Sequence, residues 1–188
     1  MNIDRDYVDA ATAAPGGRLS GPPESFWLYT AYGNVYTSSG AAFYGSPSAR
    51  SAHDTSIAGM AATRDGRGYW LVNSSGRVYN YGDAPRRSMT PALPHTTAVV
   101  GIVATPTGGY WLFTRYGNVY TSTGAKWYGS PAHRHAHEQS ITGMTATPDR
   151  GGYWLVDASG KVYNYGDAPY RPMAPALSHA HPIRGIVG

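Results

Sequence analysis

The sequence predicts an all-β protein, a four-bladed β-propeller made of repeats of about 42 residues. The first observation is a duplication: residues 25–104 align on residues 109–188 without a gap, and about 50 of the 80 positions are identical. The second is a shorter period inside each half, marked by Trp27, Trp70, Trp111 and Trp154 at spacings of 43, 41 and 43 residues. Units of this length with room for several strands are typical of propeller blades.

The second unit illustrates the predicted blade. Residues 57–63 are small and suit an inner strand near a crowded axis, and the turn "RDGRG" follows them. Tyr69–Val72 is apolar at consecutive positions, as expected for a strand covered on both faces. Gly76 permits positive φ in the next turn, before a third strand at Val78–Tyr81. The motif "GDAP" then turns the chain toward a weak outer strand.

The first unit lacks an inner strand, because nothing in residues 1–24 resembles the pattern IxGMxAT of the other units. The expected strand occurs at the other end of the chain, as Ile183–Val187. We expect it to pair beside Phe26–Thr30 and close the ring, which removes two open sheet edges. The predicted blades are 25–50 with 183–188, 56–92, 98–133 and 140–176, in a pseudo-two-fold ring. The alternatives are an open array or an eight-bladed ring of two chains.

Composition and charge exclude several classes of protein. The chain has no cysteine, so disulfides and thiolate metal sites are excluded, and no apolar run long enough to span a membrane. Residues 1–24 carry four acidic and two basic side chains, a net charge of −2, and the remainder carries 13 basic and 7 acidic, a net of +6. No basic cluster is interleaved with aromatic residues, so we expect no nucleic-acid binding.

The motif "GYWLVxxSGxVYNYGDAP", preceded by "GMxATxD", supports a family resemblance over residues 25–188. It resembles a repeat common in actinobacterial surface and secreted proteins, whose usual form is close to GYWLVASDGGVFxFGDAxFYGS. The resemblance implies a propeller displayed outside the cell. It implies no activity and no particular binding residues.

Histidines are the candidate metal ligands. The alternating histidines of "HRHAH", which include His135 and His137, could present one face to a divalent cation. The duplicated segment "ARSAHD" keeps only His53, which favours ordinary loop histidines. His53 and His137, each followed by an acidic residue, and His135 are therefore weak metal candidates, and we expect no cofactor.

Recurring aspartates are the candidate catalytic groups. Asp83 and Asp167 occur in "YGDAP", and Asp65 and Asp149 occur in turns between strands. Aspartate in such turns usually accepts backbone N–H bonds, so we interpret all four as turn residues. No catalytic motif is present, and we expect no enzymatic activity and no catalytic residues. A hydrolase that uses paired acids is the least favoured alternative.

Aromatic residues near turns are the candidate ligand-binding groups. Exposed rings beside Asn, Ser and Arg suit stacking on sugars or on a protein partner. The candidates are Tyr32, Tyr44, Tyr116, Tyr128 and Trp127. Trp127 is of most interest because its counterpart is Phe43. The alternative is that these side chains pack between blades.

Residues 1–24 have little to bury and are predicted to form an extended docking arm, anchored on other protein subunits by Tyr7 and Val8. The segment after Met1 has no secretory signal pattern. We therefore expect a non-enzymatic interaction module on the exterior of an assembly, such as a phage tail or capsid protein that contacts an actinobacterial cell envelope or glycan. The alternatives are a purely structural subunit and a secreted, lectin-like cell-surface protein.

Overall fold

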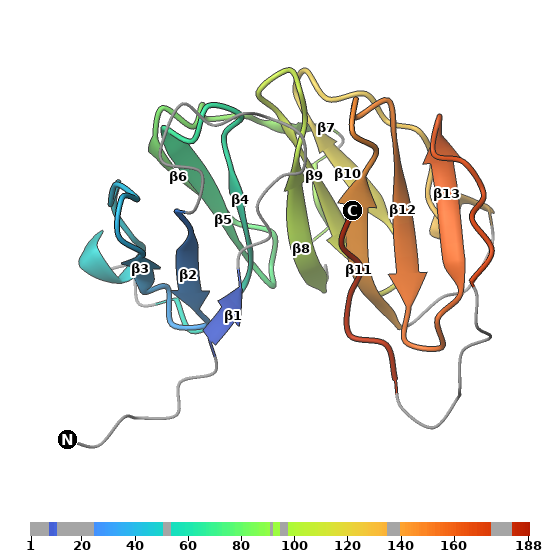
Figure 1. Cartoon of the computed structure of the whole chain (residues 1–188), viewed down its shortest axis with the longest axis horizontal. Helices are drawn as coiled ribbons and strands as arrows, with labels where there is room; N and C mark the ends of the chain where they lie inside the picture. The colour runs from blue at the N-terminus through green and yellow to red at the C-terminus, as the bar shows by residue number, and fades with distance from the viewer. Residues whose placement is uncertain are drawn as a thin grey trace.

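The computed structural model describes residues 8–10, 25–50, 54–90, 92–94, 98–134, 140–173 and 182–188. Within these residues the chain is all-β: four small antiparallel sheets stand in a row, with short 3₁₀ helices at Ser48–Arg50 and Ala132–Arg134 (Figure 1). The predicted all-β class is confirmed. No described segment forms a helix of the length and apolar character that crossing a membrane requires.

Each sheet has an inner, a middle and a third strand in chain order. Sheet 1 contains β1 (Val8–Ala10), β2 (Trp27–Thr30) and β3 (Val35–Thr37). Sheet 2 contains β4 (Ile57–Ala62), β5 (Gly68–Asn73) and β6 (Val78–Gly82). Sheet 3 contains β8 (Val99–Ala104), β9 (Tyr110–Thr114) and β10 (Val119–Ser122), with β7 (Met89–Thr90) added on the outside. Sheet 4 contains β11 (Ile141–Ala146), β12 (Gly152–Asp157) and β13 (Val162–Gly166).

The core lies between consecutive sheets, because the middle strands are apolar on both faces. All six residues of β5 are buried. Trp70 and Leu112 belong to one cluster between sheets 2 and 3, and Trp111 packs on Tyr153 between sheets 3 and 4, with ring centroids 5.3 Å apart. In every sheet the tryptophan Nε1 also donates to a carbonyl 15 residues later, at 2.8–3.0 Å.

One main-chain hydrogen bond recurs wherever the chain enters the next inner position. The donor is the first residue of that segment, and the acceptor is the carbonyl of the residue that follows the middle strand of the preceding sheet. The bonds run from Ile57 to Ala31, Val99 to Ser74, Ile141 to Arg115 and Ile183 to Ala158, with N···O distances of 2.9–3.0 Å. This bond fixes each inner segment on the sheet before it.

Glycines allow the inner segments to lie against one another. A Cβ built on Gly59 would lie 2.9 Å from the Cα of Gly101, and one on Gly143 would lie 2.9 Å from the Cα of Gly185. Real Cβ atoms do not approach backbone this closely, so a side chain at Gly59 or Gly143 would push the neighbouring inner segments apart. The predicted small inner strands are thereby explained.

The prediction that Ile183–Val187 completes sheet 1 is wrong for this structure. The strand beside β2 is β1, which pairs Val8 with Thr30 and Ala10 with Leu28. Residues 182–188 belong to no sheet and lie beside β11, held by the bond from Ile183 to Ala158 (Figure 1). The segment follows the same rule as β8, because its position is set by the sheet that precedes it and not by a distant edge.

The outer strand also differs from the prediction, which placed it in the sheet of its own repeat. β7 follows sheet 2 in the chain but pairs with β10 of sheet 3, with Thr90 opposite Thr121 and Met89 opposite Ser122. The turn after β6 directs the chain outward and across to the neighbouring sheet, where Thr123 N donates to Ser88 O at 2.8 Å. Sheets 2 and 3 are therefore joined at both their inner and outer rims.

Two glycines at duplicated positions test the close approach of strands. A Cβ on Gly101 would lie 2.6 Å from the Phe113 ring, whereas no atom of the described residues lies within 4 Å of one on Gly185. We expect Gly101→Ala to lower the free energy of unfolding by about 1–3 kcal/mol through overpacking. Gly185→Ala is the matched control and should leave it nearly unchanged. Thermal or urea unfolding measures both, and equal losses would contradict the packing described here.

Candidate functional site

The five candidate aromatic residues fall into two groups. Tyr32, Tyr116 and Trp127 are exposed, at 54%, 44% and 42% of their maximal surface. Tyr44 and Tyr128 are half-buried instead. The structure therefore divides the set into surface residues and residues that pack between sheets.

Tyr44 and Tyr128 fill equivalent gaps between sheets. The Tyr44 ring lies 5.7 Å from the Tyr69 ring, and its hydroxyl donates to the carbonyl of Gly66 at 3.3 Å. The Tyr128 ring lies 5.7 Å from the Tyr153 ring. These contacts give both residues a packing role, which was the alternative interpretation of the sequence.

Trp127 lies in a pocket formed by β10 of sheet 3 and the 3₁₀ helix at Ala132–Arg134. Its Nε1 donates to the carbonyl of Val119 at 3.1 Å, and its ring meets His133 edge-on, with centroids 5.0 Å apart and planes at 89°. These two contacts fix the indole while leaving much of it in solvent. The pocket has a volume of about 480 Å³ and is lined by Asn118, Val119, Tyr120, Thr121, Trp127, Ser130, Ala132 and His133.

Sequence reasoning identified Trp127 but not the rest of this pocket. Tyr120 lies on β10, and burial raises the pKa of its phenol. His133 comes from the 3₁₀ helix that follows. The available signal was the comparison of the halves, in which His133 replaces Ala49 just as Trp127 replaces Phe43. The two exchanged side chains contact each other at this site.

The duplicated position in sheet 1 has a simpler surface. Phe43 and Tyr36 are exposed there, at 55% and 52%. Ala49 cannot provide the ring contact that His133 makes with Trp127. Sheets 1 and 3 thus present two versions of one surface, and the version on sheet 3 has an indole held between β10 and the 3₁₀ helix.

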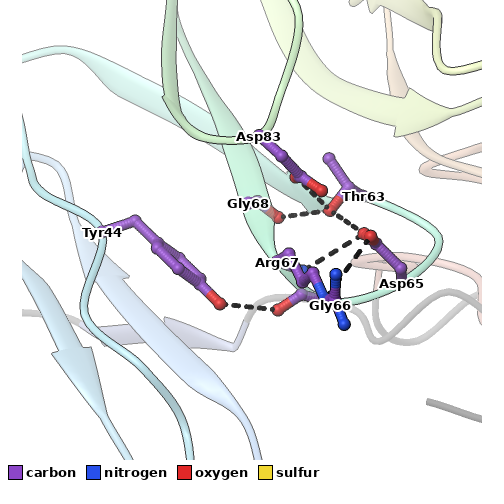
Figure 2. A network of polar contacts seen from close by, with 7 residues as sticks. All are labelled: Tyr44, Thr63, Asp65, Gly66, Arg67, Gly68 and Asp83. Atoms are coloured by element: carbon purple, nitrogen blue, oxygen red, sulfur yellow. Dashed lines mark hydrogen bonds and ion pairs between the residues drawn. The ribbon is translucent and has the colours of Figure 1, made fainter. Parts of the chain in front are cut away.

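The recurring aspartates join two turns at one end of sheet 2. The Thr63 hydroxyl lies 2.9 Å from Asp65 Oδ1 and 3.0 Å from Asp83 Oδ1, and Arg67 N donates to Asp65 Oδ1 at 3.2 Å. Figure 2 shows how these side chains meet. A hydroxyl has only one proton to donate, so it cannot serve both carboxylates and the nearby carbonyl of Gly68 at once. When Asp83 is protonated, it can donate to the hydroxyl while the hydroxyl donates to Asp65.

The pKa values of the two carboxyls move in opposite directions. Burial and the neighbouring charge of Asp65 raise the pKa of Asp83, against the hydrogen bond from Thr63. For Asp65, burial alone would raise the pKa, but the hydrogen bonds from Arg67 N and Thr63 outweigh it and lower the pKa. The pair therefore holds its first proton on Asp83.

Sheet 4 repeats this network. Thr147 Oγ1 lies 2.9 Å from Asp149 Oδ1 and 3.0 Å from Asp167 Oδ1, and Gly151 N donates to Asp149 at 3.1 Å. Asp65 and Asp149 accept backbone N–H bonds, as predicted for turn residues. Asp83 and Asp167 instead contact a threonine hydroxyl, which links the turn after β6 or β13 to the turn before β5 or β12.

The candidate metal ligands His53, His135 and His137 lie outside the described residues, as does Tyr7 of the arm. Asp54, next to His53, holds sheet 2 together: it accepts hydrogen bonds from Ser56, from Asn73 Nδ2 at 2.6 Å and from Tyr79 at 2.9 Å. Burial alone would raise the pKa of this carboxyl, but the hydrogen bonds from these donors outweigh burial, so the pKa is lowered. In the part of the chain that the structure describes, no group of three or more potential metal ligands gathers. Val8 begins β1, of which the backbone is described.

Comparison with known proteins adds no family to these observations. No family model matches the chain, and no curated protein is significantly similar to it.

The opposite pKa shifts of Asp83 and Asp65 predict opposite responses to amide substitution. A raised folded pKa contributes stability below the unfolded pKa, near 3.8, that is lost as pH rises through the folded pKa. Asp83→Asn mimics the protonated acid, so we expect a melting temperature at neutral pH equal to or above that of the wild type. A lowered pKa has the reverse effect, so Asp65→Asn should lower the melting temperature at neutral pH.

Melting curves from acidic to neutral pH distinguish the two variants. The Asp65→Asn deficit should shrink as pH falls through the folded pKa of Asp65, and the Asp83→Asn advantage should disappear at the same end of the range. A loss of stability at neutral pH in Asp83→Asn comparable to that in Asp65→Asn would contradict the assignment of the shared proton.

Proposed function

We propose that the protein is a non-enzymatic interaction module whose four sheets are blades of a propeller-type arrangement, and that its pocket on sheet 3 binds a sugar ring of a cell-envelope glycan. The proposed setting is the exterior of an assembly, a phage virion that meets an actinobacterial envelope. The resemblance of the "GYWLVxxSGxVYNYGDAP" units to actinobacterial surface repeats supports this setting.

The observation that carries the proposal is the fixed, exposed indole of Trp127. Sugar rings bind proteins by stacking an apolar face on an aromatic ring while hydroxyls find polar partners at the rim. The pocket combines Trp127 and Tyr120 with Asn118, Thr121 and Ser130, which supply amide and hydroxyl groups. Its volume of about 480 Å³ is of the size that holds a small ligand.

The aspartates support a role without catalysis. Both carboxylate pairs are engaged by threonine hydroxyls and turn amides, and neither pair lines the Trp127 pocket. Asp54 is held by three side chains of its own sheet. These groups stabilise turns and loops, which accounts for their recurrence in the duplicated sequence.

The docking of residues 1–24 onto other subunits is part of the same proposal. The backbone pairing of β1 with β2 supports it in one respect, because this stretch of the arm can add to a sheet edge as a strand. Main-chain pairing of this kind needs little apolar surface, so it suits an arm that has few apolar side chains to bury.

Binding of cell-wall polysaccharide fragments to the chain and to two variants tests the pocket. We expect Trp127→Ala to weaken binding at least about tenfold, since truncating a central aromatic side chain commonly costs that much. The matched control is Phe43→Ala on sheet 1, which should change binding little. Quenching or enhancement of tryptophan fluorescence by the glycan provides a second readout. Glycan affinity unchanged by Trp127→Ala, in a variant that melts like the wild type, would refute the pocket as the sugar site.

A further inference from the structure

One end of the row of sheets exposes residues that the duplicated positions bury inside the row. Phe26, just before β2, is 51% exposed, whereas Tyr110, 84 residues later, is 1% exposed. Tyr110 is covered by sheet 2, since its ring lies 5.6 Å from that of Trp70 and its hydroxyl donates to Arg87 O at 3.1 Å. Sheet 1 therefore presents the surface that sheet 3 uses against sheet 2, and among the described residues no other sheet covers it.

The opposite end of the row exposes the complementary surface. Met173 is 56% exposed, while its duplicate Met89 is half-buried in β7 against sheet 3. Val187 is 77% exposed, while its duplicate Val103 is half-buried in β8. The residues that cover Tyr110 recur at this end too, because Trp70 and Arg87 correspond to Trp154 and Arg171.

The strand registers match across these two ends. In sheet 3, Val99 lies opposite Thr114, Gly101 opposite Phe113 and Ile102 opposite Leu112. The duplicates of the β8 residues lie 84 positions later, and the duplicates of the β9 residues lie 84 positions earlier. The same register would therefore place Ile183 opposite Thr30, Gly185 opposite Tyr29 and Ile186 opposite Leu28. Those three β2 residues are the ones that β1 occupies in the structure. β1 is thus a three-residue substitute for the longer strand that the repeat would supply.

Gly185 is the residue that makes this correspondence specific. Its duplicate Gly101 must lack a side chain because a Cβ there would lie 2.6 Å from the Phe113 ring. Around Gly185 no described atom lies within 4 Å of such a Cβ, so its own surroundings do not require glycine. The aromatic ring that corresponds to Phe113 is Tyr29, in sheet 1 at the other end of the row.

We propose that a second copy of this chain docks head to tail on the first. Its sheet 4 and residues 182–188 take, against sheet 1, the place that sheet 2 and β8 take against sheet 3. Ile183–Val187 of that copy displaces β1 from the edge of β2, and β1 covers this edge in the free chain. The proposal is independent of glycan binding, because it uses neither Trp127 nor its pocket.

Two variants shift this association in opposite directions. Gly185→Val places a branched side chain where the docked strand would meet Tyr29, so it should weaken self-association at least about tenfold while leaving the melting temperature of the dilute protein unchanged. Asp9→Pro removes a backbone N–H from β1 and disfavours its pairing, so it should strengthen self-association. Sedimentation velocity and light scattering over a wide concentration series measure both effects.

Single cysteines identify the interface, because the chain has none of its own. Ile183→Cys protein mixed with Thr30→Cys protein should form a disulfide-linked heterodimer on oxidation, since directly opposed residues of paired strands lie within disulfide reach. The double variant should yield covalent oligomers.

Four results would overturn the proposal. The first is a folded wild type that stays monomeric at every concentration, and the second is association that Gly185→Val does not weaken. The third is a double variant that cross-links only within one chain, which would mean that the chain closes on itself. Association without a cross-linked heterodimer would place the interface elsewhere and would also refute this one.

Discussion

The hydrogen bond by which each inner segment attaches to the sheet before it is the constraint on which the rest of the structure depends. It recurs four times with nearly the same length, at Ile57, Val99, Ile141 and Ile183. This bond sets where each inner segment starts, and glycines let neighbouring inner segments touch. The middle strands carry larger side chains, so they lie farther apart than the inner segments. Aromatic rings fill the wedges that result, and each tryptophan N–H has a carbonyl acceptor within its own unit.

This frame explains where the sequence is free to vary. Positions that set the wedge, such as Tyr69 and Tyr153, are the same in both halves and fully buried. By contrast, the exchange of Phe43 for Trp127 and of Ala49 for His133 changes a surface and leaves these buried positions unchanged. The described residues contain a single ion pair, Asp65 with Arg67, and it is exposed. Stability therefore derives mainly from apolar burial and turn hydrogen bonds, and Arg150 and Asp157 are buried without forming an ion pair among the described residues.

The sequence predicts the strands well because their signals are local. The apolar run at Tyr69–Val72 and the positive φ of Gly76, 88° in the structure, follow from side-chain pattern and steric freedom alone. Strand pairing depends on distant parts of the chain, and both wrong predictions concern pairing. β1 takes the edge of β2 that was predicted for Ile183–Val187, and β7 joins the following sheet. At the candidate site, composition indicated aromatic residues near turns, but only packing distances separate Tyr44 and Tyr128 from Trp127. The contact of His133 with Trp127 depends on the 3₁₀ helix at Ala132–Arg134, which no sequence pattern predicted.

The transfer of β7 to the neighbouring sheet means that the repeat in the sequence and the unit in space are out of phase. A fragment cut at the boundaries of the sequence repeat would carry an outer strand with nothing to pair to and a third strand missing its cover. Adjacent sheets 2 and 3 therefore depend on each other for stability, and a substitution that destabilises one sheet should also destabilise the other. Gain or loss of repeats in such a chain is least disruptive when the cut falls between a third strand and the outer strand that follows it, as between β6 and β7, because all four strands of sheet 3 then stay together.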